Sequence, residues 1–271
     1  MKREGRFRPL QRGIPLRAIA PNAVTVTALC FGLTGIRFAI AGEFERAVVA
    51  ILIAGVLDGM DGRIARALHG ESRFGAELDS LSDSIAFGVA PALVIFLWSL
   101  IGIPQYGWLF ALAHAVFCVL RLARFNAQID AAEQPHKSAG FLTGVPAPAG
   151  AGLAFLPMFL WLWTGIEDFR NPWFVAPWIA LVAFLMISSV ATYSWSSLKL
   201  RQNVRFEAIA VIALVTGALI TAPWATLSVV SAAYIVTIPF SILSYRRVKR
   251  QRAGLRGPAP AASHDAEPPA A

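Results

Sequence analysis

Charged residues are scarce in this sequence, and their scarcity narrows the class of protein. Only 15% of the 271 residues are Asp, Glu, Lys or Arg, whereas 56% are hydrophobic and the mean hydropathy is +0.59. Soluble domains carry about 25% charged residues. The composition therefore excludes an ordinary soluble domain and favours an all-α polytopic membrane protein.

Cysteine and histidine are also scarce, which limits the metal chemistry that the chain can support. Both cysteines, Cys30 and Cys118, lie within apolar stretches, where free buried thiols are expected rather than a disulfide or a metal pair. The four histidines have no metal-ligand spacing to one another: they are His69, His114, His136 and His264. We expect polar or packing roles for them.

Basic residues exceed acidic ones, giving a net charge of +8 and a pI near 10.2. A nucleic-acid partner would need these residues clustered on a soluble face. Here they flank apolar runs, so no nucleic-acid partner is expected. Residues 1–18 form a basic arm that suits anionic lipid headgroups, and we expect no cleavable signal peptide, because no small-residue cleavage site follows a short apolar run.

Eight apolar stretches are each close to the roughly 20 residues that cross the hydrocarbon core of a bilayer. They cover residues 19–41, 46–67, 79–102, 106–125, 148–165, 173–193, 205–221 and 224–245. Only a tight turn at Ala222 and Pro223 separates the last two, so apolar length alone leaves a count of seven or eight. Lys and Arg, which favour cytoplasmic loops, decide between them.

With eight spans, one side of the membrane collects most of the basic residues. They are those of the N-terminal arm, Arg63, Arg66, Arg73, Arg121, Arg124, Lys137, Lys199, Arg201, Arg205 and the cluster in residues 246–256. The other side keeps Arg46 and Arg170. This asymmetry predicts eight spans in the cytoplasmic membrane with both termini cytoplasmic. Residues 19–245 would then be the membrane domain, and residues 246–271 a basic, then Pro/Ala-rich, disordered tail.

Four carboxylates stand beside or inside two of these spans, in a setting where ionisable residues are rare and functional. Asp58 and Asp61 are three residues apart, and Asp79 and Asp83 are four apart, so each pair shares one helical face. Two divalent cations would balance the four charges, and all-oxygen ligation favours Mg, Mn or Ca. A structural salt-bridge cluster with nearby arginines is the alternative; those arginines are Arg63, Arg66 and Arg73.

The acids belong to a longer pattern, DxxDGxxAR, then eight residues, then GxxxDxxxD. It resembles the signature of the CDP-alcohol phosphatidyltransferase family at every defined position: Asp58, Asp61, Gly62, Ala65, Arg66, Gly75, Asp79 and Asp83. The runs DSLSDSIAFGVAPA, RLARFN and FLTGVPAPAGAG resemble the branch that uses L-serine, and PNAVT at residues 21–25 resembles the family's first span. The resemblance covers residues 20–152.

The resemblance implies a helical homodimer with a polar active-site cavity open to the cytoplasm. It implies that Asp58, Asp61 and Asp79 bind two divalent ions, that Asp83 binds metal or acts as the general base, and that the CDP group is held by Gly62, Ala65, Arg66 and Gly75. The reaction implied is transfer of the phosphatidyl group from CDP-diacylglycerol to the hydroxyl of L-serine, with release of CMP.

Acceptor recognition is a separate inference. A zwitterionic acceptor needs a cation for its carboxylate, and Arg121 and Arg124 share a face at the cytoplasmic end of the fourth span. Their alternative role is to snorkel toward headgroups. Asn126 and Lys137 are further candidates for binding serine or phosphate, although Lys137 would also suit a lipid phosphate.

Two other functions remain compatible with the acidic stretch. One is the same chemistry with glycerol phosphate or inositol phosphate as the acceptor, which would demand extra cations. The other is a cation transporter, which predicts acids spread across the membrane depth and often an internal repeat. Here the acids gather at one face and no repeat is visible, which favours the enzyme.

Overall fold

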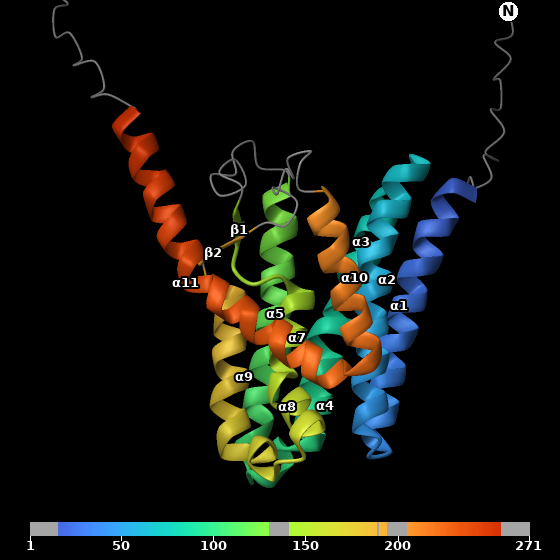
Figure 1. Cartoon of the computed structure of the whole chain (residues 1–271). Coiled ribbons are helices and arrows are strands. Elements are labelled where there is room, and N and C mark those ends of the chain that lie inside the picture. The colour runs from blue at the N-terminus through green and yellow to red at the C-terminus, as the bar shows by residue number, and fades with distance from the viewer. Residues whose placement is uncertain (1–15, 130–140, 189, 194–204, 256–271) are drawn as a thin grey trace, which may run out of the picture.

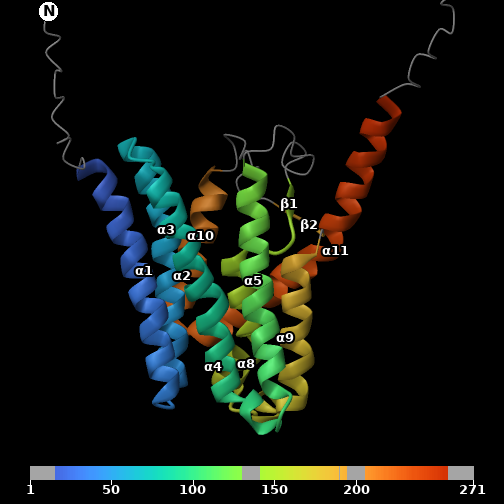
Figure 2. The ribbon, with the colours of Figure 1, turned by 180° about the vertical axis from the view of Figure 1, so that it is seen from behind.

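The computed structural model describes residues 16–129, 141–188, 190–193 and 205–255, and these form a bundle of helices. Most of the helices run along a common direction, while the long helix α11 (Pro223–Leu255) crosses the bundle obliquely (Figures 1 and 2). The beginning of α1 and the end of α11 lie at the same end of the bundle. This end also carries the connection between α2 and α3.

The first half of the bundle contains the acidic stretch. Its elements are α1 (Leu16–Ile40), α2 (Phe44–Leu68), α3 (Arg73–Asp83), a π-helical turn η1 (Ser84–Val89), α4 (Ala90–Trp98), a short 3-10 turn η2 (Leu100–Gly102) and α5 (Gly107–Ile129). Helix α3, η1 and α4 follow one another without a break. The second half of the acidic motif, with Asp79 and Asp83, therefore lies at the beginning of a continuous helical segment.

The second half consists of shorter helices and a small ribbon. Its elements are β1 (Phe141–Thr143), α7 (Ala147–Ala154), α8 (Leu156–Thr164), a 3-10 turn η3 (Glu167–Arg170), α9 (Pro172–Ile187), β2 (Ala191–Tyr193), α10 (Arg205–Thr221) and α11. Strands β1 and β2 pair antiparallel, with Leu142 opposite Thr192. Because its strands have only three residues each, this ribbon does not change the all-α fold class that the sequence predicts.

The helices confirm a polytopic membrane protein. Among the described residues, four helical segments are long and apolar enough to cross a membrane alone: Ile19–Ile40, Arg73–Trp98, Gly107–Ala127 and Pro223–Ser244. Helices α7 and α8, bent by 41° relative to each other, make a fifth if they form one broken span. Helix α2 is 25 residues long but carries the charged motif, and α9 and the apolar part of α10 are shorter. The count of eight spans stays a prediction.

Two predicted boundaries differ from the structure. The sixth apolar stretch was expected to run to Tyr193, but α9 ends at Ile187, because the following residues turn away to pair with β1 and Gly144 N–H donates to Val190 O at 2.7 Å. At the other boundary, α11 continues to Leu255, ten residues into the segment assigned to the tail. A sequence of Arg, Lys and Gln favours helix as readily as disorder.

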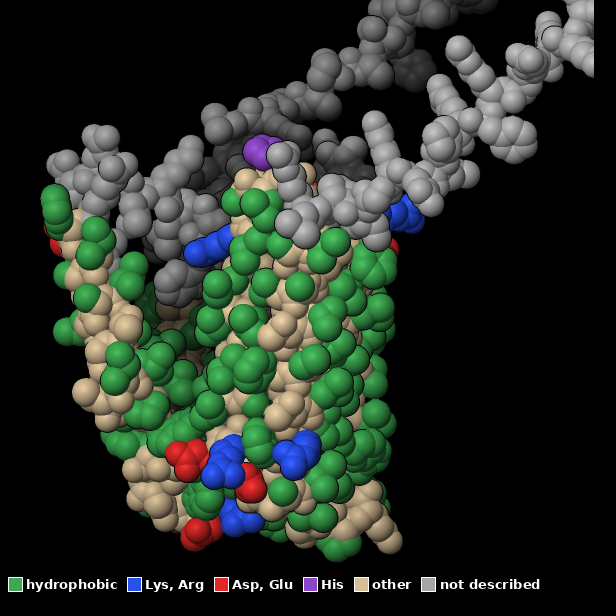
Figure 3. Space-filling model, turned by 90° about the vertical axis from the view of Figure 1, so that its right-hand side faces the viewer, with side chains coloured by type: hydrophobic (Ala, Val, Ile, Leu, Met, Phe, Trp, Pro, Cys, Tyr) green, Lys and Arg blue, Asp and Glu red, His purple; other side chains and the backbone are tan. Residues whose placement is uncertain are grey.

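Close helix packing in the first half depends on small residues. A Cβ on Gly32 of α1 would lie 3.0 Å from Ala86 Cα, and one on Gly35 would lie 2.8 Å from a side-chain carbon of Ile51 in α2. Lipid tails are as apolar as leucine, so packing and hydrogen bonds must hold membrane helices together. Figure 3 shows a flank covered by hydrophobic side chains, which suits contact with lipid tails. Acidic and basic side chains gather on it at the end opposite the beginning of α1.

Arg170 joins several elements at that opposite end. Its Nε donates to Trp98 O at 2.9 Å, and its own carbonyl accepts from Ser99 Oγ at 2.7 Å. The guanidinium lies 5.9 Å from the ring centre of Phe44 and 5.6 Å from that of Trp161. One arginine thus connects η3 with the beginning of α2, the end of α4 and the middle of α8.

Replacing Arg170 by Ala is expected to lower the thermal unfolding midpoint of the detergent-purified protein. The change removes a hydrogen bond and two cation–π contacts, together about 2 kcal/mol. Arg46→Ala is the matched control, because Arg46 pairs only with Glu43 at the surface, and exposed ion pairs contribute about 0–1 kcal/mol. Equal unfolding midpoints for the two variants would contradict the anchoring role of Arg170.

Candidate active site

A tight turn between α2 and α3 brings the two halves of the acidic motif together. Helix α2 ends with His69 in the left-handed conformation, at φ 51° and ψ 39°, and Gly70 N–H donates to Ala65 O at 2.9 Å, as in a Schellman motif. Helix α3 begins at once, since Ser72 Oγ caps it by accepting from Gly75 N–H at 3.0 Å. The chain therefore reverses within four residues.

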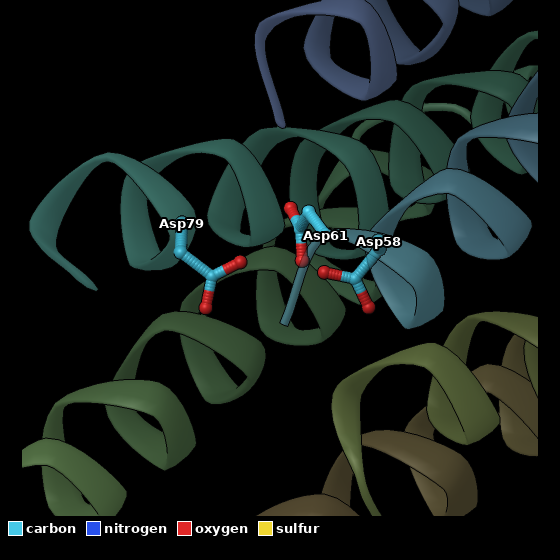
Figure 4. Close-up of side chains that lie close together, drawn as sticks. All are labelled: Asp58, Asp61 and Asp79. Carbon is cyan, nitrogen blue, oxygen red and sulfur yellow. The ribbon is translucent and has the colours of Figure 1, made fainter. Parts of the chain in front are cut away.

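This reversal places carboxylates of α2 and α3 face to face. Asp58, Asp61 and Asp79 each offer a carboxylate oxygen, and these oxygens lie within 4.8 Å of one another (Figure 4). The side chain of Asp83 lies within hydrogen-bond reach of Asp58. The structure thus brings together all four acids that the sequence singled out.

The acids are not neutralised by arginines. Among the described residues, the one ion pair joins Arg46 to Glu43 at the beginning of α2, about three helical turns before Asp58. Arg63, Arg66 and Arg73 all lie in the described part and make no ion pair with the acids, which argues against a structural salt-bridge cluster. Four facing carboxylates repel one another. Their oxygen-only donor set fits a hard divalent cation, so the cluster could hold a metal.

Thr25 of α1 positions one of these carboxylates, although it lies outside the acidic motif. Its Oγ1 lies 2.5 Å from Asp61 Oδ2 as a hydrogen-bond donor, and both side chains are buried. The backbone carbonyl of Thr25 accepts from Ser82 Oγ of α3 at 3.3 Å. Helix α1 is thereby connected to both halves of the motif. The PNAVT run contained the only sequence signal for this residue.

A cavity of about 460 Å³ opens beside the acids. The four residues predicted to hold CDP all line it. The whole lining consists of Pro21, Asn22, Thr25, Asp61, Gly62, Ala65, Arg66, Gly70, Glu71, Ser72, Gly75, Ala76 and Asp79. A Cβ on Gly75 would lie 2.8 Å from Asn22 Oδ1, so a side chain there would displace a lining residue. The absence of a side chain at Gly75 keeps α1 and α3 close at the cavity wall.

The predicted acceptor residues on α5 lie in different surroundings. Arg121 is buried, and its Nε has no hydrogen-bond partner among the described residues. Arg124 donates to Ser188 O at the end of α9 at 3.1 Å, and Asn126 donates to Ser80 Oγ of α3 at 2.8 Å. Lys137 lies outside the described residues. The binding roles of all four stay predictions.

Comparison with known proteins agrees with this arrangement. The model of the CDP-alcohol phosphatidyltransferase family matches residues 18–195, about two thirds of the chain and all of the acidic motif. This chain belongs to the CDP-alcohol phosphatidyltransferase family. A second family model, CDP-alcohol phosphatidyltransferase 2, matches residues 204–239, which cover α10 and the first half of α11. The protein is therefore an enzyme of this family.

Curated members of the phosphatidyltransferase family resemble most of the chain. A protein of Mycobacterium bovis is 40% identical over 236 residues, which are 87% of this chain and 82% of that protein. A protein of Mycobacterium leprae is 38% identical over 239 residues, covering 88% and 79%. One of Helicobacter pylori is 31% identical over 179 residues, covering 66% and 73%. All three are named CDP-diacylglycerol–serine O-phosphatidyltransferase.

Thr25→Val is expected to weaken metal binding by this phosphatidyltransferase about tenfold, because residues that orient a ligand carboxylate typically contribute that much. Valine keeps the shape of threonine but cannot donate to Asp61. Thr25→Ser, which keeps the hydroxyl, is expected to bind nearly as the wild type does. Titration of Mn²⁺ followed by electron paramagnetic resonance of the free ion measures both. Wild-type affinity in Thr25→Val would refute the positioning role.

Gly75→Ala is expected to weaken binding of CMP about tenfold, since the new methyl group forces Asn22 to move at the cavity wall. Gly59→Ala is the matched control on α2, because a Cβ there meets no atom within 4 Å. Isothermal titration calorimetry of detergent-purified variants with CMP gives the comparison. If both variants bind CMP equally well, Gly75 does not shape the nucleotide site.

Proposed function

We propose that this protein transfers the phosphatidyl group of CDP-diacylglycerol to the hydroxyl of L-serine and releases CMP. The observation that carries the proposal is the meeting of carboxylates from α2 and α3 beside a cavity lined by the glycines and the arginine of the same motif. The names of the curated relatives support CDP-diacylglycerol as the donor and serine as the acceptor.

Asp58, Asp61 and Asp79 would hold divalent cations, Mg or Mn and alternatively Ca, and two ions would balance the charge of the four acids. When bound, such ions neutralise a pyrophosphate and stabilise a departing phosphate oxygen. Thr25 keeps the Asp61 carboxylate in place through its hydroxyl. The metal identity and the number of ions belong to the proposal.

Asp83 is the residue that we assign to the proton of the acceptor. It lies on the same helical face as Asp79 and next to Asp58, so one carboxylate can take a proton while its neighbours hold metal. The serine oxygen forms a bond to the phosphorus that carries diacylglycerol, and the bond from that phosphorus to the CMP oxygen breaks. The hydroxyl proton passes to Asp83.

The remaining motif residues form the nucleotide cradle. Gly62 and Ala65 on α2 and Gly75 on α3 present little or no side chain to the cavity, so the CDP group can approach the backbone. Arg66 lines the same cavity and supplies a fixed cation with a planar donor geometry that suits phosphate.

Acceptor recognition falls to α5 in this proposal. Arg121 is the best placed of the predicted cations for the serine carboxylate, because it is buried and its Nε has no protein partner among the described residues. Arg124 has one donor engaged by the end of α9, and its other donors, for which no partner is seen in the described part of the chain, would serve the acceptor or a phosphate. Asn126 and Lys137 complete the set.

The orientation in the membrane is part of the same proposal. The beginning of α1, the α2–α3 connection, the end of α5 and the end of α11 lie at one end of the bundle (Figure 1). This is the end that the excess of Lys and Arg assigns to the cytoplasm. Both termini, residues 1–18 and 246–271, would flank the membrane domain 19–245 on that side, and the protein would work as a homodimer.

The test is release of CMP from CDP-diacylglycerol by the purified protein with Mn²⁺ or Mg²⁺, with and without L-serine. Release is expected to require metal and serine, and Asp83→Asn is expected to slow it at least about a hundredfold. Glu77→Gln is the matched control, an exposed acid on the same helix α3, and should release CMP at the wild-type rate.

Other outcomes separate the alternatives. Release stimulated by glycerol phosphate or inositol phosphate instead of serine would keep the chemistry and overturn the acceptor. An Asp83→Asn variant as fast as the wild type would remove the general-base role. Folded protein that releases no CMP with any acceptor would overturn the transferase and favour an ion pathway through the acidic cluster.

A further inference from the structure

The helix that carries Asp79 and Asp83 changes its geometry directly after Asp83. Residues 84–89 form a π-helical turn, in which Ala90 N–H donates to Ile85 O five residues back. Single π-turns inside α-helices are frequent at functional sites. Here the turn separates α3, in which Ser82 is the one buried residue, from α4, which is mostly buried.

A proline accounts for the break in the α-helical pattern. In a regular α-helix, the carbonyl of Phe87 would accept from the N–H of residue 91, but Pro91 has no N–H and its ring crowds that carbonyl. Phe87 is buried, so water cannot readily replace the donor that Pro91 lacks. A carbonyl left without a partner in such a place is costly.

His114 of α5 supplies a donor for this carbonyl. Its side chain is fully buried, and Nε2 lies 3.3 Å from Phe87 O. Because a carbonyl can only accept, the hydrogen bond requires the proton on Nε2. Nδ1 of the same ring has no hydrogen-bond partner among the described residues, so Phe87 is the polar contact that accounts for a histidine here.

Helix α5 also packs closely against the π-turn, so the position of α5 affects the position of the turn. A Cβ on Gly88 would lie 3.3 Å from Cys118 Cβ and 3.5 Å from Ala115 O, so the turn rests directly on the backbone of α5. The extra residue in a π-turn rotates everything before it relative to everything after it. The direction in which Asp79 and Asp83 point therefore depends on this turn.

We propose that His114 is a positioning residue, which fixes the π-turn through the Phe87 carbonyl and so aims Asp79 and Asp83 at the carboxylates of α2. The inference rests on the proposed function only in assigning metal binding to those carboxylates. His114 touches no substrate. Its effect reaches the site through η1, over about one turn of helix to Asp83 and about two turns to Asp79.

The competing interpretation is a histidine that only fills space between α5 and η1. Two substitutions separate the two roles. His114→Gln keeps an N–H donor at a similar distance from the backbone, whereas His114→Leu fills similar space and has no donor. Cys118→Ala serves as the control for packing, because it loosens the same interface at Gly88 without touching the Phe87 carbonyl.

The experiment measures Mn²⁺ affinity of the full-length, detergent-purified variants by electron paramagnetic resonance of the free ion, together with their thermal unfolding midpoints. His114→Leu is expected to bind Mn²⁺ about tenfold more weakly, the usual effect of losing a residue that orients metal ligands. His114→Gln and Cys118→Ala are expected to stay within about twofold of the wild type.

The possible results distinguish a positioning role of His114 from a packing role. Wild-type Mn²⁺ affinity in His114→Leu, or equal losses in His114→Leu and His114→Gln, would overturn the positioning role. If His114→Leu does not fold while His114→Gln folds and binds Mn²⁺ normally, the donor is essential, as proposed; if neither folds, the residue has a packing role. Wild-type protein that binds no more Mn²⁺ than Asp58→Ala would instead refute the proposed metal site and not this inference alone.

Discussion

Mutual repulsion among four carboxylates is the constraint that the surrounding structure has to satisfy. Two helices would separate such charges if nothing else held them, and no arginine among the described residues pairs with them. Neutral contacts do the holding instead: the capped turn at Ser72, the Thr25 hydroxyl on Asp61, and the Asn126 amide on Ser80. Because these contacts bring no positive charge, the negative charge of the acids can still attract cations.

The two ends of the bundle are stabilised by different means. The end opposite the acids is held by Arg170, whose Nε donates to one backbone carbonyl and whose guanidinium lies near two aromatic rings. The acidic end uses hydrogen bonds between small polar side chains and leaves charges uncompensated. Helix α2 connects the two ends, and its 25 residues span about 37 Å. The contacts of Arg170 and the acidic cluster therefore lie toward opposite ends of the bundle.

The sequence predicted the acids well and their supports poorly. Asp58, Asp61, Asp79 and Asp83 follow from helical spacing, because residues three and four apart share a face whatever the tertiary structure. Thr25 and Asp61 are 36 residues apart, so no local pattern reveals their hydrogen bond. His114 escaped for the same reason, since its partner is a backbone carbonyl and no side-chain motif records it.

The helix boundaries show a similar division. Apolar length located the long helices of the described residues, yet it extended α9 to Tyr193, because Val190, Thr192 and Tyr193 suit a strand at least as well as a helix. Apolar length also gave no sign of the 41° bend between α7 and α8. Pairing with the distant strand β1 ends α9, whereas the bend lies at Pro157 near the beginning of α8, which has no N–H to continue the hydrogen bonding of α7.

Helix α10 differs from the acidic motif, because little of its surface packs against other helices. Its apolar side chains are largely exposed, with Phe206, Leu214 and Ile220 each more than 70% accessible, and its main neighbour is α11. In a bilayer such side chains face lipid, which accepts Leu, Ile, Val or Phe almost equally. Exchanges among Leu, Ile, Val and Phe on the exposed side of this helix therefore change few contacts within the chain, whereas a change at Thr25 removes a hydrogen bond and one at Gly75 alters the cavity wall.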